Sequence, residues 1–311
     1  MQIATILSVN QPYIRMFAGF CLVFCFVFCL KNLQFENLKI MESLSNQILD
    51  PTSDQNCAAI ACHHLYTAYQ STLKRPILNG IDLQINHGEF VALLGLNGAG
   101  KSTLLRSLVG LVPVKQGEIQ ICGTSVNPSQ INEVRKNVGF LFQGGGLVEQ
   151  LSCLDNVLCG CLGDLNTWES LWGFPKRDRR IAMQLLQKMG LQEQIYQKAR
   201  YLSGGQRQRV AIARTLIQSP HILLADEPTT GLDVSGIEQV MNSLQEIHRQ
   251  GITVVVVLHD LALAAKYAQR AIILQEGQVM YDGACQNMED QFAKLQNQSI
   301  VQSPMQSPIA A

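Results

Sequence analysis

Four continuous apolar runs mark the middle and the C-terminal half of the chain. They are FVALLGL (90–96), VGFLF (138–142), HILLAD (221–226) and ITVVVVLHD (252–260). A half-exposed strand alternates apolar and polar residues, whereas a strand that is covered on both faces is apolar throughout. The four runs therefore predict a mainly parallel sheet, covered on both faces, at the core of an α/β domain.

The segment between the second and third runs has a different pattern. It contains no strand-like run and instead shows helical windows such as RRIAMQLLQKMG (179–190). We expect a helical subdomain at about 147–205, inserted into a domain that spans 57–286. The remaining tail, 287–311, is polar, and we predict that it is disordered.

Residues 1–56 form an extension that precedes this domain. The run from Met16 to Leu30 carries no charge, but a membrane-spanning helix needs about 20 apolar residues. A secretory signal would end at a small-residue cleavage site, whereas the polar segment KNLQFENLK follows here. We interpret residues 1–40 of the extension as non-native, with translation beginning at Met41; a membrane-associated helix is the alternative.

The composition narrows the class of partner and the redox compartment. The chain of 311 residues is 47% hydrophobic, which is enough for a substantial core. Lys plus Arg number 24 and Asp plus Glu also number 24, so no charge excess favours nucleic acid as a partner. The ten cysteines include no CxxC pair, which favours reduced thiols in the cytosol.

A glycine-rich segment, GLNGAGKS, directly follows the first apolar run and opens a helical window. It fits G-x-x-x-x-G-K-[ST] in the strand, loop and helix order that the phosphate-binding P-loop requires. Its glycines allow a tight turn whose N–H groups point at phosphate oxygens, and the helix N-terminus adds partial positive charge. We expect Lys101 to reach the β- and γ-phosphates and Ser102 to bind Mg²⁺. The predicted nucleotide-binding residues here are Gly95, Leu96, Asn97, Gly98, Ala99, Gly100, Lys101, Ser102 and Thr103.

Two carboxylates end the third apolar run, and a histidine follows the fourth. At a buried strand tip beside a P-loop, Asp226 is suited to the magnesium site. Glu227 is then suited to polarise a water in line with the γ-phosphate. His259 ends the neighbouring strand, which favours a contact with the same phosphate.

A second glycine turn, YLSGGQRQRV (201–210), also opens a helical window. Ser203 and the N–H groups of Gly204 and Gly205 can cap a helix and bind an anion. The turn has no lysine and no magnesium ligand, so it can complete a phosphate site but cannot form one alone. An ordinary helix cap is the alternative interpretation.

Together these motifs resemble the ATP-binding cassette (ABC) family of ATPases over about residues 60–284. The resemblance implies a P-loop NTPase fold of ABC type, with a mainly parallel sheet core, an antiparallel β subdomain and an inserted helical subdomain. The motifs stand in the family's order: Tyr69, GLNGAGKST (95–103), Gln143 in LFQ, LSGGQ (202–206), LLADEP (223–228), GLD (231–233) and His259.

The resemblance also implies a role for each matching residue. Tyr69 stacks on adenine, with Tyr66 as the competing aromatic. Gln143 senses Mg²⁺ and the attacking water, and Glu227 is the general base. Two cassettes meet head to tail, so that the signature of one closes over the ATP of the other. The residues that serve the partner's site are Ser203, Gly204, Gly205, Gln206 and Asp233, the last of which couples the two sites.

Three further segments are similar to the phosphonate-import ATP-binding subunits: DNVLCGCLG (155–163), LNTWESLWGFPKRDRRIA (165–182) and LHDLALAAKYAQRAI (258–272). Three positions depart from that subgroup. Asp260 stands where Gln is common, Gly231 stands where Ser is usual, and a run of three glycines follows Gln143. These departures do not affect the ATPase prediction but leave the transported solute open.

We therefore predict a homodimeric ATPase at the cytoplasmic face of the inner membrane, using ATP and Mg²⁺. It would drive uptake of phosphonate or a related phosphorus oxyanion through permease subunits, with a separate binding protein supplying the solute. One alternative is the ATPase of another ABC transporter, for another solute, a lipid or haem. The other is a soluble cassette protein acting on DNA or ribosomes, but tandem cassettes or a coiled-coil insertion, expected for such proteins, do not occur here.

Overall fold

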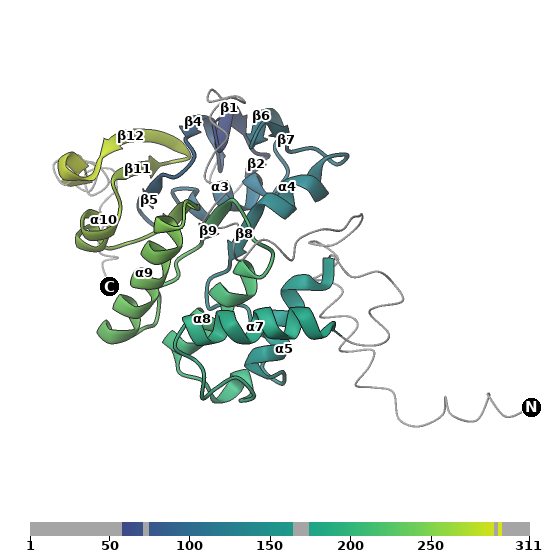
Figure 1. Cartoon of the computed structure of the whole chain (residues 1–311). Helices are drawn as coiled ribbons and strands as arrows, with labels where there is room; N and C mark the ends of the chain where they lie inside the picture. The colour runs from purple at the N-terminus through teal and green to yellow at the C-terminus, as the bar shows by residue number, and fades with distance from the viewer. Residues whose placement is uncertain (1–57, 71–74, 164–173, 289–291, 294–311) are drawn as a thin grey trace, which may run out of the picture.

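A six-stranded sheet forms the centre of the protein (Figure 1). The computed structural model describes residues 58–70, 75–163, 174–288 and 292–293. The strands of the sheet are β5 (Phe90–Leu94), β8 (Val138–Leu141), β9 (Ile222–Ala225), β10 (Thr253–Val257), β11 (Arg270–Gln275) and β12 (Gln278–Ala284). Their order is β12-β11-β5-β10-β9-β8, and only β11 and β12 pair antiparallel. The predicted parallel sheet is confirmed, and each of the four apolar runs contains one of its strands.

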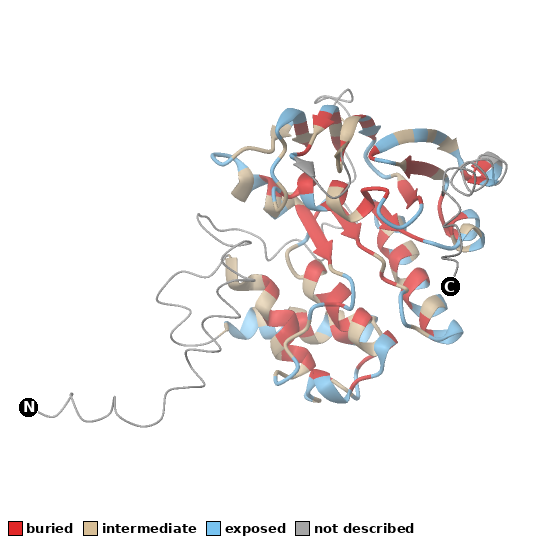
Figure 2. Cartoon of the chain, turned by 180° about the vertical axis from the view of Figure 1, so that it is seen from behind, coloured by how far each residue is buried: buried red, intermediate tan, exposed pale blue. Residues whose placement is uncertain are grey.

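Both faces of this sheet are buried, as Figure 2 shows for the central strands. On β5, Val91 and Leu93 belong to one hydrophobic cluster, whereas Phe90, Ala92 and Leu94 belong to a second cluster on the opposite face. A strand that contributes alternate residues to two cores has no position left for a polar side chain. This explains why the sequence shows unbroken apolar runs.

An antiparallel sheet lies over the first of these clusters, at the top of Figure 1. Its order is β4-β1-β6-β7, and its buried residues pack in the same core as the P-loop helix α3. The elements of this part are β1 (Ile60–Tyr66), β2 (Tyr69–Gln70), β3 (Arg75–Pro76), β4 (Asn79–Ile85), α3 (Lys101–Leu108), β6 (Gln116–Ile121), β7 (Thr124–Ser125) and α4 (Ile131–Asn137).

A group of helices at the bottom of Figure 1 has a core of its own. Its elements are α5 (Cys153–Leu158), η1 (Cys159–Gly163), α7 (Lys176–Lys188), η2 (Ala199–Tyr201) and α8 (Gly204–Leu216). Helix α8 belongs to two cores, because Val210 and Ala213 face this cluster while Ala211 and Ile212 face the parallel sheet. Residues 164–173, which include both tryptophans, lie outside the described residues.

The second face of the parallel sheet is covered by α8, α9 (Val234–Arg249) and α10 (Leu261–Tyr267). Aspartates cap the last two helices. Asp233 accepts from Gly236 N at 3.1 Å, and Asp260 accepts from Ala262 N at 2.7 Å. Within the described ranges, no helix combines the length and apolar character needed to cross a membrane.

The folded region extends beyond the C-terminal boundary expected from the sequence. After η3 (Cys285–Asn287), Met288 is fully buried and Phe292 is 8% exposed, both in the cluster under α9 and α10. The expected polar tail at 287–311 therefore contributes two core residues at its start, because apolar side chains scattered in a polar sequence can still find a buried site. The rest of that tail, 294–311, and the N-terminal extension lie outside the described residues.

Arg270, at the start of β11, connects this strand to β12 and to the segments that precede β5. We predict that replacing it destabilises the protein. Its guanidinium contacts Asp282 at 2.6 Å, Glu89 at 2.8 Å and the carbonyl of Gln84 at 2.9 Å. Arg270→Met leaves both carboxylates without their cation, so it should lower the free energy of unfolding by about 1–3 kcal/mol. Arg249→Met is the control, because Arg249 is exposed on α9 and its pair with Glu246 should contribute under about 0.5 kcal/mol. Urea unfolding measures both, and equal midpoints for the two variants would contradict the prediction.

Candidate functional site

The carboxyl ends of four parallel strands bring most of the predicted site residues together. Gly95 follows β5, Gln143 follows β8, Asp226 follows β9, and His259 follows β10. Hydrogen bonds continue the sheet beyond the strands themselves: Asp226 N donates to Leu141 O at 2.9 Å. Ligands of open α/β sheets bind at this edge, because here the chain leaves the buried strands and polar groups become accessible.

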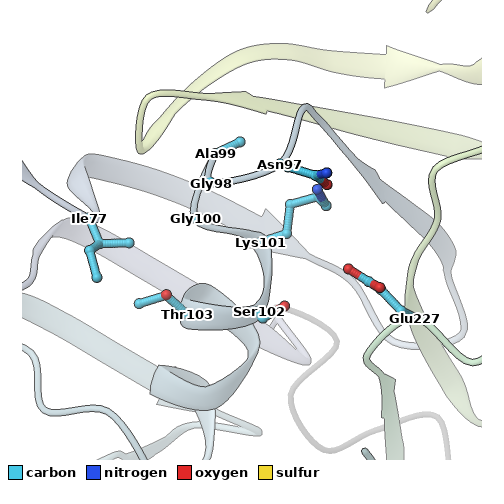
Figure 3. A pocket seen from close by; sticks show the side chains of 9 residues that line it. All are labelled: Ile77, Asn97, Gly98, Ala99, Gly100, Lys101, Ser102, Thr103 and Glu227. Carbon is cyan, nitrogen blue, oxygen red and sulfur yellow. The ribbon is translucent and has the colours of Figure 1, made fainter. Parts of the chain in front are cut away.

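The P-loop encloses a cavity of about 230 Å³ (Figure 3). The loop begins at Gly95, whose φ is +145°; a Cβ there would lie 2.3 Å from Leu274 O, so no other residue fits. Figure 3 shows the side chain of Glu227 opposite the loop. The cavity is lined by Ile77, Asn97, Gly98, Ala99, Gly100, Lys101, Ser102, Thr103 and Glu227.

Lys101 supplies the positive charge of this cavity. Its side chain is buried, and its Nζ donates to Gly95 O at 2.8 Å and to Leu96 O at 3.1 Å. Burial lowers the pKa of the Lys101 ammonium, while the nearby carboxylates of Glu227 and Asp226 act in the opposite direction. The loop carbonyls thus hold the ammonium at the cavity wall, where an anionic phosphate can replace them as its partner.

Ser102 and Asp226 form an oxygen-rich pair beneath the loop. Ser102 Oγ donates to Asp226 Oδ1 at 2.7 Å, and Arg106 Nη2 lies 3.3 Å from Asp226 Oδ2. The Asp226 side chain is only 2% exposed, so its charge depends on these partners. A hydroxyl beside a carboxylate is the donor set that Mg²⁺ prefers, so the two residues fit the predicted metal.

The carboxylate of Glu227 accepts hydrogen bonds at both oxygens. Gln143 Nε2 donates to Oε2 at 2.9 Å, His259 Nε2 lies 2.9 Å from Oε1, and Thr230 Oγ1 donates to Oε2 at 3.2 Å. The backbone of Glu227 has φ +50°, which costs a non-glycine residue about 1 kcal/mol. Contacts from two other loops and from its own loop thus hold a strained residue, with its carboxylate beside the phosphate cavity.

The signature residues do not line this cavity. Ser203 caps α8 in a capping box: Gln206 N donates to Ser203 Oγ at 3.3 Å, and Ser203 N donates to Gln206 Oε1 at 2.9 Å. Gly204 lies against Leu232 of the GLD segment, where an added Cβ would be 2.8 Å from Leu232 Cδ2. The structure therefore brings Ser203–Gln206 next to Asp233, away from the chain's own P-loop.

The two candidate adenine-stacking residues lie in the antiparallel part of the protein. Tyr69 belongs to β2, but its side chain lies outside what the structure describes. Tyr66 ends β1, and its hydroxyl approaches Gly80, so it does not line the P-loop cavity. The prediction that Tyr69 stacks on adenine stays a prediction.

Three described residues of the site were not predicted from the sequence. Ile77 lines the cavity, Arg106 contacts Asp226, and Thr230 contacts Glu227. Arg106 and Thr230 do have a signal, since Arg106 lies one helical turn after Ser102 and Thr230 lies three residues after Glu227. Ile77 has none, because it approaches the P-loop only through the tertiary fold.

Several known proteins are similar to this chain in sequence. The ABC transporter family model matches residues 78–230. Phosphonates import ATP-binding protein PhnC 2 of Nostoc sp. is 62% identical over 234 residues, which cover 75% of this chain and 96% of the relative. The chain belongs to the ABC transporter family. A PhnC protein of Lactobacillus acidophilus is 45% identical over 218 residues, covering 68% of this chain and 84% of the relative.

A solved structure of the family agrees with the cassette fold. It is a dimeric, post-hydrolysis ATP-binding cassette bound to ADP and Pi, with 31% identity and a TM-score of 0.64. The match covers 73% of this chain and 98% of that chain. The predicted P-loop fold of ABC type is confirmed, and so is the predicted ATPase class.

The site analysis predicts that Glu227→Gln separates nucleotide binding from turnover in this cassette. Gln keeps the size of the side chain but cannot accept a proton, and a positioned base typically contributes 10²- to 10⁴-fold in rate. Steady-state ATP hydrolysis should fall by about that factor, while equilibrium ATP binding should remain within about threefold. Glu238→Gln, an exposed change on α9, is the matched control and should keep full turnover. Unchanged hydrolysis by the Glu227 variant would remove this residue from the role of base.

Proposed function

We propose that this chain is the ATPase subunit of an importer for phosphonate or a related phosphorus oxyanion. The observation that carries the ATPase half is the convergence of Gln143, Glu227 and His259 at the edge of the P-loop cavity. The cargo is supported by the relatives, which are named phosphonate-import proteins and match over nearly their whole length. Domain limits near 57–286 and 147–205 are part of the proposal, with Met288 and Phe292 packing onto the first domain beyond its C-terminal limit.

In this mechanism the P-loop binds and orients the phosphates of ATP. N–H groups of the loop and the Lys101 ammonium neutralise the β- and γ-phosphate oxygens, and α3 directs its N-terminus at them. Ser102 and Asp226 would hold Mg²⁺, with Gln143 nearby. When bound, Mg²⁺ neutralises charge that develops on the phosphate oxygens. Arg106 keeps the buried Asp226 carboxylate in place.

Glu227 orients the attacking water and accepts its proton. For that purpose one carboxylate oxygen must exchange a present partner for water. Thr230, whose contact with Oε2 is longer than that of Gln143 (3.2 Å against 2.9 Å), is the simplest to exchange. His259 stays on the other oxygen and is placed to contact the γ-phosphate, as the resemblance implies. The carboxylate thus acts from a pre-set orientation, which lowers the reorganisation needed at the moment of reaction.

A second copy of the chain completes the site. Ser203, Gly204 and Gly205 offer a helix N-terminus without a cation of their own, and Ser203 and Gly204 are exposed. Val234, which follows Asp233, is 79% exposed, a value that suits a contact surface rather than a core position. The dimeric cassette bound to ADP and Pi supports pairing of two copies of this chain, and the head-to-tail arrangement is part of the proposal.

The dimer would work on the cytoplasmic face of the inner membrane, bound peripherally to permease subunits. Closure over ATP followed by hydrolysis and reopening would drive the permease between its two access states. A solute-binding protein would act on the other side of the permease and would not touch this chain. The balanced charge of the sequence gives no reason to add nucleic acid to these partners.

Mixing two inactive variants tests whether the nucleotide sites are shared between chains. Lys101→Ala removes the phosphate-binding ammonium, and Ser203→Arg blocks the signature turn. Each homodimer should hydrolyse ATP at a few per cent of the normal rate or less. In a heterodimer, one site carries both defects and the other carries none, so part of the activity should return.

The measurement uses differently tagged chains, purified together as the heterodimer. Each parent homodimer, prepared with the same two tags, is the control. A heterodimer that is shown to form, yet hydrolyses ATP no faster than its parents, would count against nucleotide sites shared between chains.

Growth on phosphonate tests the cargo separately from the ATPase. Cells lacking this gene should fail to grow with methylphosphonate as the sole phosphorus source and should grow normally on inorganic phosphate. The wild-type gene should restore growth, whereas the Glu227→Gln gene should not. Normal growth of the deletion strain on methylphosphonate, with no second importer gene present, would reject this cargo and leave the ATPase proposal standing.

A further inference from the structure

The loop after β8 connects the catalytic edge of the sheet to the helical part of the protein. It contains three consecutive glycines, Gly144, Gly145 and Gly146, with φ values of 71°, 77° and 57°. All three adopt the left-handed conformation, which glycine reaches without steric cost. Glycine also loses the most backbone freedom on being ordered, so this loop needs external contacts to hold one conformation.

Arg214 of α8 provides such contacts. Its Nη1 donates to Gly146 O at 2.8 Å, and its Nη2 donates to Gly145 O at 2.7 Å. A planar guanidinium that donates to two successive carbonyls fixes both their positions and their direction. The carbonyls of Gly145 and Gly146 both face the guanidinium of Arg214. The two hydrogen bonds therefore favour this particular loop conformation.

The loop also lies directly on the surface of α8. Gly145 is buried, and a Cβ at this position would lie 3.3 Å from Ala211 Cβ and 3.4 Å from Arg207 O. Gly145 N donates to Phe142 O at 2.9 Å and closes a turn around Gln143. The helix therefore holds the second half of the turn, while Gln143 occupies the first half.

Few contacts position the side chain of Gln143. Its side chain is exposed, and within the described residues its hydrogen bond is the one to Glu227 Oε2, at 2.9 Å. We propose that Arg214 is a positioning residue that holds the loop so that Gln143 reaches Glu227. This inference rests on the proposed function, in which both side chains act on the γ-phosphate end of ATP.

The test compares Arg214→Gln with a matched change on the same helix. Arg209 is the control, because its Nη1 also donates to a backbone carbonyl, that of Met189 at 2.8 Å, but not to the loop. In the full-length, nucleotide-free chain, Arg214→Gln should accelerate amide exchange in residues 142–148 by about tenfold or more. Arg209→Gln should leave exchange in that segment unchanged, even if both variants unfold at a lower temperature.

Turnover provides the second readout. Arg214→Gln should lower kcat for ATP hydrolysis by about 10- to 100-fold with KM changed less than about twofold, because the loop does not bind the phosphates. Arg214→Lys keeps the charge but cannot form the two-pronged contact, so it should restore only part of kcat. Arg209→Gln should retain the normal kcat.

A double-mutant cycle with Gln143→Ala shows whether Arg214 acts through Gln143. If it does, adding Arg214→Gln to Gln143→Ala should lower kcat no further. Unchanged loop exchange in Arg214→Gln, or a loss of kcat that multiplies with that of Gln143→Ala, would overturn the inference. If Gln143→Ala alone keeps full turnover, the catalytic role proposed for Gln143 is what fails; the exchange measurement then still decides whether Arg214 holds the loop.

Discussion

Burial of the parallel sheet on both faces is the constraint on which the rest of this structure depends. A strand such as β5, with alternate residues in two hydrophobic clusters, has no place for a charged side chain along its length. On β5, β8, β9 and β10, charge appears only where the chain leaves the sheet. Because parallel strands end at one edge, polar residues that follow β5, β8, β9 and β10 meet there, and a single site receives Lys101, Gln143, Glu227 and His259.

This constraint also explains how much could be predicted from the sequence. Short continuous apolar runs between turn residues are typical of buried strands, and here the residues that follow them carry the chemistry. Both the sheet and the main site residues therefore follow from one pattern. Contacts made through tertiary packing leave no such trace. Ile77 reaches the cavity from the antiparallel part. The burial of Met288 and Phe292 could not be predicted from the polar sequence around them, because two buried residues do not make a periodic pattern.

The three positions that depart from the phosphonate-import subgroup have local structural reasons. Asp260 accepts hydrogen bonds from Ala262 N and Leu263 N and so caps α10. Gly231 has φ +76°, where glycine is less strained than serine. The glycine run after Gln143 takes a left-handed path onto α8. The local geometry of the cassette thus accounts for all three features without reference to its cargo.

Helix α8 is packed on two sides. Its buried residues divide between the sheet core and the helical core, so it cannot shift against one without disturbing the other. The same helix begins at Ser203 and carries Arg214 eleven residues later, about 16 Å along its axis. One end would face the partner's nucleotide, and the other holds the loop of Gln143. Because α8 is one continuous helix, the end that would face the partner and the contact with the loop of Gln143 belong to a single structural element.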